Sequence, residues 1–186
     1  MKKKIVFIMN PISGTSSKAA VPSLIDSTLD KEQFEYEIKM TERPGHASEL
    51  AAEARDNHAD IVVAVGGDGT VNEVARSLVH SDSALGILPC GSGNGLARHL
   101  LLPMNLKKSI EIINACEIHD LDYGVINEYP FFCTCGMGFD AFVSMKFAES
   151  GKRGPISYAE NILREGLKYE PETYTLEDET GTKQYK

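Results

Sequence analysis

The chain has 186 residues, which is enough for one complete hydrophobic core and part of a second. Its 42% apolar and 25% charged content is typical of a globular protein, and without a run of about 18 apolar residues no part of it is expected to span a membrane. A net charge of −8 argues against binding to nucleic acid and against electrostatic docking on anionic lipid.

The first quarter of the chain alternates strand and helix patterns. Residues 4–9 form an apolar first strand, and the polar turn 10–14 leads to a helix whose apolar face lies within residues 21–29. Residues 34–40 then alternate apolar and charged side chains, which predicts a half-exposed strand at a sheet edge. A second helical face lies within residues 47–54.

The alternation continues beyond residue 60. Residues 61–65 are an unbroken apolar run, typical of a strand buried on both faces of a parallel sheet, and a helical face within residues 71–78 follows. Residues 84–88 form another buried strand, helical faces lie within residues 96–113, and residues 117–126 are predicted to be a strand. This order predicts a three-layer α/β domain over residues 1–126, with a parallel sheet between two layers of helices.

Three polar loops that contain glycine follow strands of this predicted sheet: residues 10–14, 66–70 and 91–95. In an open parallel sheet such loops gather at the carboxyl ends of the strands, where ligands bind. In residues 60–72, a strand, a glycine turn and a helix follow directly on one another, so backbone N–H groups at the helix start can hold phosphate oxygens. The alternative is an ordinary turn in which Asp68 caps the helix.

Residues 127–186 differ in character. Strands are predicted at residues 130–135 and 172–176, and helices at 141–148 and 156–167, with a Gly/Pro-rich linker at 150–155 between the helices. Residues 178–181 resemble a hairpin turn, and the partner strand that follows reaches the end of the chain. We therefore expect residues 127–186 to be the beginning of an incomplete β-rich domain, which leaves self-association through unpaired strands open.

The cysteines and the glycine loops limit the kinds of site that the sequence can form. The four cysteines form no Cys-x-x-Cys pair, and we expect small, buried apolar residues in a reducing cytosol, consistent with a cytoplasmic location. The chain has neither the usual P-loop nor the Gly-x-Gly-x-x-Gly motif of dinucleotide-binding folds after its first strand. Phosphate binding would therefore depend on backbone amides, Thr and Asn side chains, and Mg²⁺.

Four motifs in one order resemble the diacylglycerol kinase catalytic-domain family, which includes bacterial lipid kinases and is related to the sphingosine kinases. They are Asn-Pro-x-Ser-Gly from residue 10, Gly-Gly-Asp-Gly-Thr-x-Asn-Glu from residue 66, Pro-x-Gly-Ser-x-Asn from residue 89, and Gly-x-Gly-x-Asp-Ala from residue 136. Gly-Gly-Asp-Gly-Thr alone is shared with the NAD kinases. The resemblance implies a nucleotide-binding α/β domain followed by a β-sandwich domain, with the active site in the cleft between them.

The resemblance also implies an ATP-dependent lipid kinase that transfers the γ-phosphoryl group to a lipid hydroxyl, with Mg²⁺ held by Asp68. By matching motifs, the nucleotide-binding residues are Asn10, Pro11, Ser13, Gly14, Thr41, Gly66, Gly67, Asp68, Gly69, Thr70, Asn72, Glu73, Gly91, Ser92 and Asn94. The family's general base lies in an Asp-Gly-Glu-containing region beyond Lys186. We therefore assign no catalytic base and expect weak nucleotide binding and little kinase activity from this chain.

Several alternatives stay open. Gly95 stands where many bacterial lipid kinases carry Asp, which favours a sphingoid base over diacylglycerol as acceptor. An NAD kinase, and a non-catalytic nucleotide-binding or regulatory module, are the competing functions. The expected partners are ATP and a lipid alcohol, with transient contact to a membrane surface and no nucleic acid.

Overall fold

The computed structural model of the protein describes residues 2–12, 18–149 and 169–185. The chain divides into two compact units, Met1–Thr134 and Cys135–Lys186. The domain boundary predicted after residue 126 lies before this division. The assignment of the first part as a nucleotide-binding domain and of the second as a lipid-kinase domain stays a prediction.

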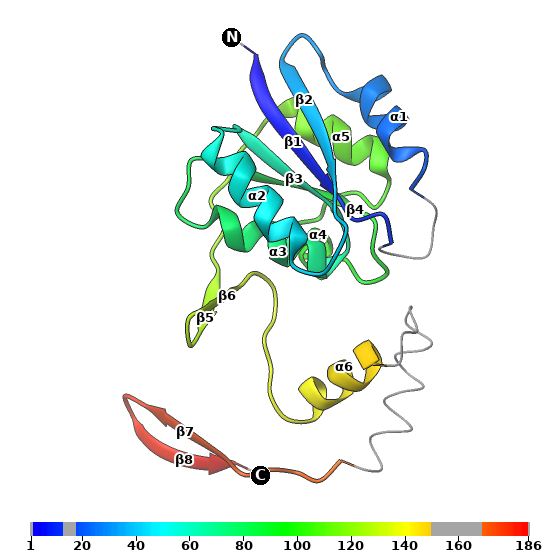
Figure 1. Ribbon diagram of the computed structural model, residues 1–186. Helices are drawn as coiled ribbons and strands as arrows, with labels where there is room; N and C mark the ends of the chain where they lie inside the picture. Colours follow the sequence, from blue (N-terminus) through cyan, green and yellow to red (C-terminus); the bar gives the residue numbers. More distant parts are fainter. Residues whose placement is uncertain (1, 13–17, 150–168, 186) are drawn as a thin grey trace. The chain divides into compact units, whose positions relative to one another are not determined.

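The first unit is built on a parallel sheet of four strands in the order β2-β1-β3-β4 (Figure 1). All three pairings are parallel, as the predicted alternation of strands and helices requires. The strands are β1 (Lys3–Met9), β2 (Phe34–Met40), β3 (Ile61–Gly66) and β4 (Ala84–Pro89).

Burial follows strand position. Every residue of β3, in the interior of the sheet, is buried, which explains its unbroken apolar sequence. β2 lies at an edge, and its charged residues Glu35 and Glu37 alternate with less exposed apolar ones, which confirms the predicted half-exposed edge strand.

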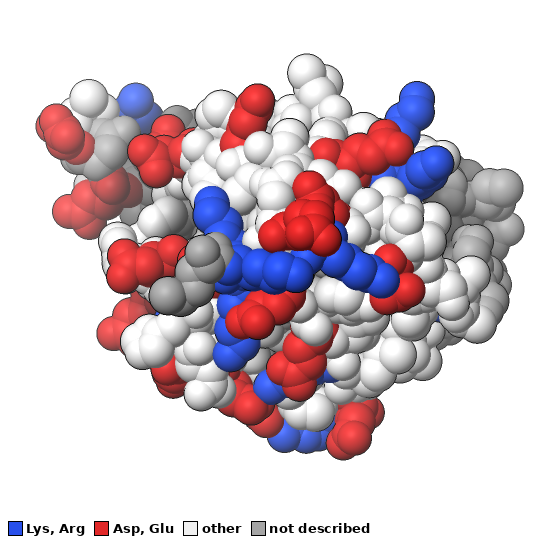
Figure 2. All heavy atoms as spheres, turned by 90° about the horizontal axis from the view of Figure 1, so that it is seen from above, with Lys and Arg blue, Asp and Glu red and all other residues white. Residues whose placement is uncertain are grey.

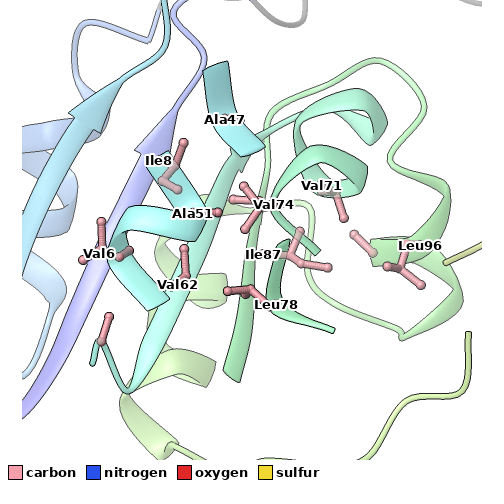
Figure 3. Packing of buried hydrophobic residues seen from close by; sticks show 14 residues of the cluster. Val6, Ile8, Ala47, Ala51, Val62, Val71, Val74, Leu78, Ile87 and Leu96 are labelled. Carbon is pink, nitrogen blue, oxygen red and sulfur yellow. The ribbon is translucent and has the colours of Figure 1, made fainter. Parts of the chain in front are cut away.

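Helices cover both faces of the sheet, so the three-layer fold is confirmed (Figure 1). On one face, α1 (Val21–Thr28) and α5 (Leu106–Ala115) pack on Phe7 and Val63. On the other face, α2 (His46–Asp56), α3 (Asp68–Leu78) and α4 (Gly95–His99) pack on Val6 and Val62. Figure 3 shows this second core, in which Ala51 of α2 lies close to Val74 of α3.

The predicted strand over residues 117–126 is wrong for most of its length. Only β5 (Gly124–Ile126) forms, and it pairs antiparallel with β6 (Tyr129–Phe131), shorter than the strand predicted over residues 130–135. Glu117, Asp120 and Asp122 are exposed, and a stretch with this many acidic residues has no buried face with which to join the sheet.

The second unit contains α6 (Phe139–Glu149) and a hairpin of β7 (Tyr174–Asp178) and β8 (Gly181–Tyr185). The predicted hairpin turn is confirmed, since Asp178 pairs with Gly181. The predicted linker 150–155 and helix 156–167 lie outside the described residues.

Surface properties bear on two further predictions. Cys90 and Cys116 are half-buried, but Cys133 and Cys135 are exposed, so burial of all four cysteines was wrong; the latter two follow the short strand β6. No described helix is both long enough and apolar enough to cross a bilayer. On the face in Figure 2, acidic and basic side chains are interspersed.

Candidate nucleotide-binding site

The strand order brings the loops after β1, β3 and β4 to adjacent positions along one edge of the sheet. The backbone N–H of Asn10 donates to the Val65 carbonyl (3.1 Å), and the N–H of Cys90 donates to the Gly66 carbonyl (2.8 Å), so the carboxyl ends of these strands are level. The chain leaves β1 toward α1 on one face and leaves β3 toward α3 on the other. The crevice between two such diverging loops is where open α/β sheets bind ligands.

Asn10 shapes the loop after β1. Its side-chain oxygen accepts a hydrogen bond from the Ile12 N–H (3.0 Å), and its amide nitrogen lies 3.5 Å from the hydroxyl of Thr70 in α3. The loop therefore contacts the glycine turn of the neighbouring strand. Pro11 is exposed, and the predicted binding residues Ser13 and Gly14 lie outside the described residues.

Lys18, which the motifs did not single out, lies at the end of the same loop. Its side chain is only 6% exposed, and its Nζ donates to the Asn10 carbonyl (2.7 Å). Burial lowers the pKa of the Lys18 ammonium, and burial also raises the pKa of the nearby Cys90 thiol. A cation is thus held beside the backbone of Asn10, and no motif in the sequence signals its burial.

Two glycine loops touch each other at Gly67 and Gly91. A Cβ built on Gly91 would lie 2.4 Å from the Gly67 Cα, closer than real contacts permit, so no larger residue fits at Gly91 without movement. Gly67 is the N-cap of α3, whose first residues include Asp68 and Gly69. The free N–H groups of this helix start therefore lie next to the loop after β4.

Asn94 organises that second loop. It has left-handed backbone (φ +56°) and is buried, and its side-chain amide makes two bonds to Gly91: the oxygen accepts from the Gly91 N–H (2.9 Å), and the nitrogen donates to the Gly91 carbonyl (2.8 Å). Through these two bonds the Asn94 side chain holds the shape of its own loop. The neighbouring Ser92 side chain is exposed, where a ligand can reach it.

Asp68 joins the two glycine loops. Its carboxylate accepts hydrogen bonds from the N–H groups of Asn94 (2.8 Å) and Gly95 (2.6 Å) at the start of α4. Each carboxylate oxygen has a second lone pair, and Asp68 is exposed, so it can still face a cation. The carboxylate therefore fixes the spacing of the loops and keeps coordinating capacity.

Glu73 faces a different part of the structure. Its carboxylate accepts from the N–H groups of Gly45 and Ala47, both at 3.1 Å, and so caps the start of α2. The turn that it holds follows Thr41, a buried residue whose N–H donates to the Met9 carbonyl (2.9 Å). Glu73 thereby positions the turn that follows Thr41 at the end of β2.

A cavity of about 400 Å³ within the first unit opens beside Asp68. Asn72 lines it together with Asp68, while Leu96, Phe131 and Phe132 form an apolar side. The structure thus brings Asp68 and Asn72 to one cavity, whereas Asn10, Thr41 and Ser92 lie outside its lining. Within residues 2–12, 18–149 and 169–185, no three His, Cys, Asp or Glu side chains cluster as an all-protein metal site requires.

Comparisons with known proteins agree with this geometry. The model of the diacylglycerol kinase catalytic domain matches residues 4–126. The chain is 32% identical over 163 residues to a diacylglycerol kinase of Staphylococcus saprophyticus, covering 85% of this chain and 53% of that protein. It is 31% identical to a diacylglycerol kinase of Staphylococcus epidermidis, with 85% and 51% covered.

A crystal structure of a diacylglycerol kinase from Bacillus anthracis has the same fold. The TM-score is 0.60 at 24% sequence identity, with 69% of this chain and 48% of that chain covered. The chain spans about half the length of the curated relatives described here.

Proposed function

The chain belongs to the diacylglycerol kinase catalytic-domain family, and on that premise we propose that the protein transfers the γ-phosphoryl group of ATP to the hydroxyl of a lipid. The observation that carries the proposal is the bond of Asp68 to the N–H groups of Asn94 and Gly95, which locks two glycine loops together at the carboxyl edge of the sheet. Named relatives that are diacylglycerol kinases favour a lipid acceptor over NAD.

In the proposed complex, the triphosphate lies along the loops that follow β1 and β3. Backbone N–H groups of the loop 10–14 and of the start of α3 would hold its oxygens, with hydroxyl donors from Ser13, Thr41 and Ser92. The buried Lys18 ammonium adds positive charge behind the loop 10–14. Glu73 and Asn94 act indirectly, because their described bonds position backbone of the site.

Mg²⁺ fits this donor set as a nucleotide-bound ion. Magnesium in kinase sites is held by one or two carboxylates together with the phosphates of the substrate, and it keeps several waters. Asp68 is a carboxylate with unused lone pairs, and Asn72 beside it offers an amide oxygen. When bound, the ion would neutralise charge on the phosphates, and the chain's own loops would hold the triphosphate in line for attack.

The test is an acceptor panel. ATP is supplied with diacylglycerol, a sphingoid base or NAD, and product is measured for this chain and for a longer form of the protein. We expect a phosphorylated lipid from the longer form and little turnover from the chain alone. Phosphorylation of NAD, or of none of the three acceptors by the longer form, would contradict the proposal.

Nucleotide binding is tested separately on this chain by calorimetry with Mg-ATP. The Asp68→Ala variant should bind Mg-ATP more weakly while retaining its fold. Asp56→Ala is the matched control, because Asp56 is an exposed carboxylate at the far end of α2 that pairs with Arg55. Equal affinity of both variants and the original chain would argue against the site.

A further inference from the structure

The α4–α5 loop, residues 100–105, presents apolar side chains to solvent. Leu101 is 89% exposed, and Leu100 and Met104 are 39% and 36% exposed. Leu101 also has a φ of +56°, in the left-handed region that favours glycine. This conformation belongs to the turn that ends α4, in which the N–H groups of Leu101 and Leu102 donate to the carbonyls of Arg98 and Ala97. The backbone is therefore explained by the helix end, and the exposed leucine side chain is the feature that a partner surface would contact.

The charge around this loop is opposite to that of the whole protein. Between Asp82 and Glu111 the sequence has no acidic residue, but it contains Arg98, Lys107 and Lys108. All three cations are exposed. The net charge of −8 is therefore carried elsewhere, and the loop is an apolar tip flanked by positive charge.

The two lysines also stand at an unfavourable place in α5. They occupy its first turn, where no acidic residue is present and where the helix macrodipole is positive. An anionic surface against this turn would neutralise the positive charge of the two lysines and of the helix N-terminus. Negative charge is thus favoured in whatever the loop contacts.

The loop is joined directly to the candidate site. Arg98 Nε donates to the Gly93 carbonyl (2.8 Å), and the Asn94 side-chain amide lies 3.8 Å from the Met104 sulfur. Gly93 and Asn94 belong to the loop that Asp68 holds. A surface that binds the α4–α5 loop would therefore lie close to the phosphate-binding loops.

We propose that the α4–α5 loop docks the protein reversibly on the surface of an anionic lipid bilayer. Leu100, Leu101 and Met104 would enter the boundary between headgroups and acyl chains, while Arg98, Lys107 and Lys108 contact the headgroups. A few apolar side chains give only weak, reversible binding. The biological use of this docking rests on the proposed lipid kinase function, because such an enzyme meets its acceptor in a bilayer.

A second copy of the chain is a poorer occupant. In a two-fold dimer formed through this loop, the same surface would face itself, and the flanking cations of both copies would be brought together. A bilayer with anionic headgroups meets the same apolar tip with opposite charge.

The experiment measures sedimentation of the 186-residue chain with vesicles of phosphatidylcholine alone, or mixed with phosphatidylglycerol, without ATP. We expect binding to the anionic vesicles that weakens with salt. Leu101→Gly should weaken it about tenfold, the effect of removing one inserted leucine side chain. Lys107→Gln and Lys108→Gln should each weaken it about fivefold on the anionic vesicles.

Two features keep the result interpretable. Glycine tolerates the φ of Leu101, so Leu101→Gly should unfold at the same urea concentration as the original chain or a higher one. Ile118→Gly is the matched control, since Ile118 is 61% exposed outside the loop, and it should bind vesicles normally.

Absence of vesicle binding by the original chain would overturn the proposal. So would unchanged binding in Leu101→Gly, or a concentration-dependent dimer that this variant abolishes. Because no nucleotide is present, failure of the kinase assays would leave this result unaffected, and normal kinase activity without vesicle binding would reject the docking alone.

Discussion

The bond between Asp68 and the start of α4 makes a quantitative prediction about stability. Asp68→Ala removes two acceptor contacts, at 2.8 Å to Asn94 and 2.6 Å to Gly95. Hydrogen bonds to a charged group contribute about 1.5–3 kcal/mol each when shielded from solvent, but Asp68 is exposed and water can replace it. We therefore expect the free energy of unfolding to fall by about 1–3 kcal/mol in total.

Urea denaturation with linear extrapolation measures this loss, and amide hydrogen exchange localises it. The N–H groups of Asn94 and Gly95 should exchange faster in Asp68→Ala. Asp68→Asn keeps one acceptor oxygen and should lose about half as much. Asp56→Ala is the control, because an exposed ion pair contributes about 0–1 kcal/mol. An unchanged urea midpoint with unchanged protection of both amides would refute the reasoning.

Three further predictions concern neighbouring residues. Gly91→Ala should destabilise the chain by about 1–3 kcal/mol and weaken Mg-ATP binding, because its Cβ would collide with Gly67; Gly69→Ala, where a Cβ meets nothing within 4 Å, is the control and should be neutral or stabilising in urea denaturation. Glu73→Ala removes both capping bonds of α2 and should cost about 1–2 kcal/mol by the same measurement, and an unchanged value would reject the capping role. Lys18 has a folded pKa below its ordinary 10.5, so the unfolded chain binds more protons and stability should rise with pH as that lowered pKa and then 10.5 are passed. This rise should be missing in Lys18→Met, and parallel pH curves of unfolding free energy for both proteins would contradict the assignment.

The layered fold could be predicted because burial on both faces leaves a simple pattern. The unbroken apolar run of β3 and the alternation of β2 each follow from strand position in the sheet. The strand prediction for residues 117–123 was wrong because alternation between acidic and apolar residues resembles an edge strand. In the structure these residues pair with no strand of the parallel sheet.

The convergence of the glycine loops could be predicted from the alternation of strands and helices, but the contacts between the loops could not. Asp68 and Glu73 stand five positions apart in one motif, yet one bonds to the start of α4 and the other to the start of α2. Which backbone N–H each carboxylate reaches depends on helices distant in sequence. Lys18 was missed for the same reason, since its burial arises from tertiary packing.

The fully buried residues of helix α2 are all alanines, Ala47, Ala51 and Ala54, and Ala51 lies beside Val74 of α3 (Figure 3). The methyl group of an alanine has no alternative rotamer that could make room for a larger neighbour. A bulkier residue at Ala51 would therefore displace the helix as a rigid body, together with the turn at Gly45 that Glu73 grips. The geometry around Thr41 is in this way adjustable from the interior, by residues that no nucleotide could ever touch.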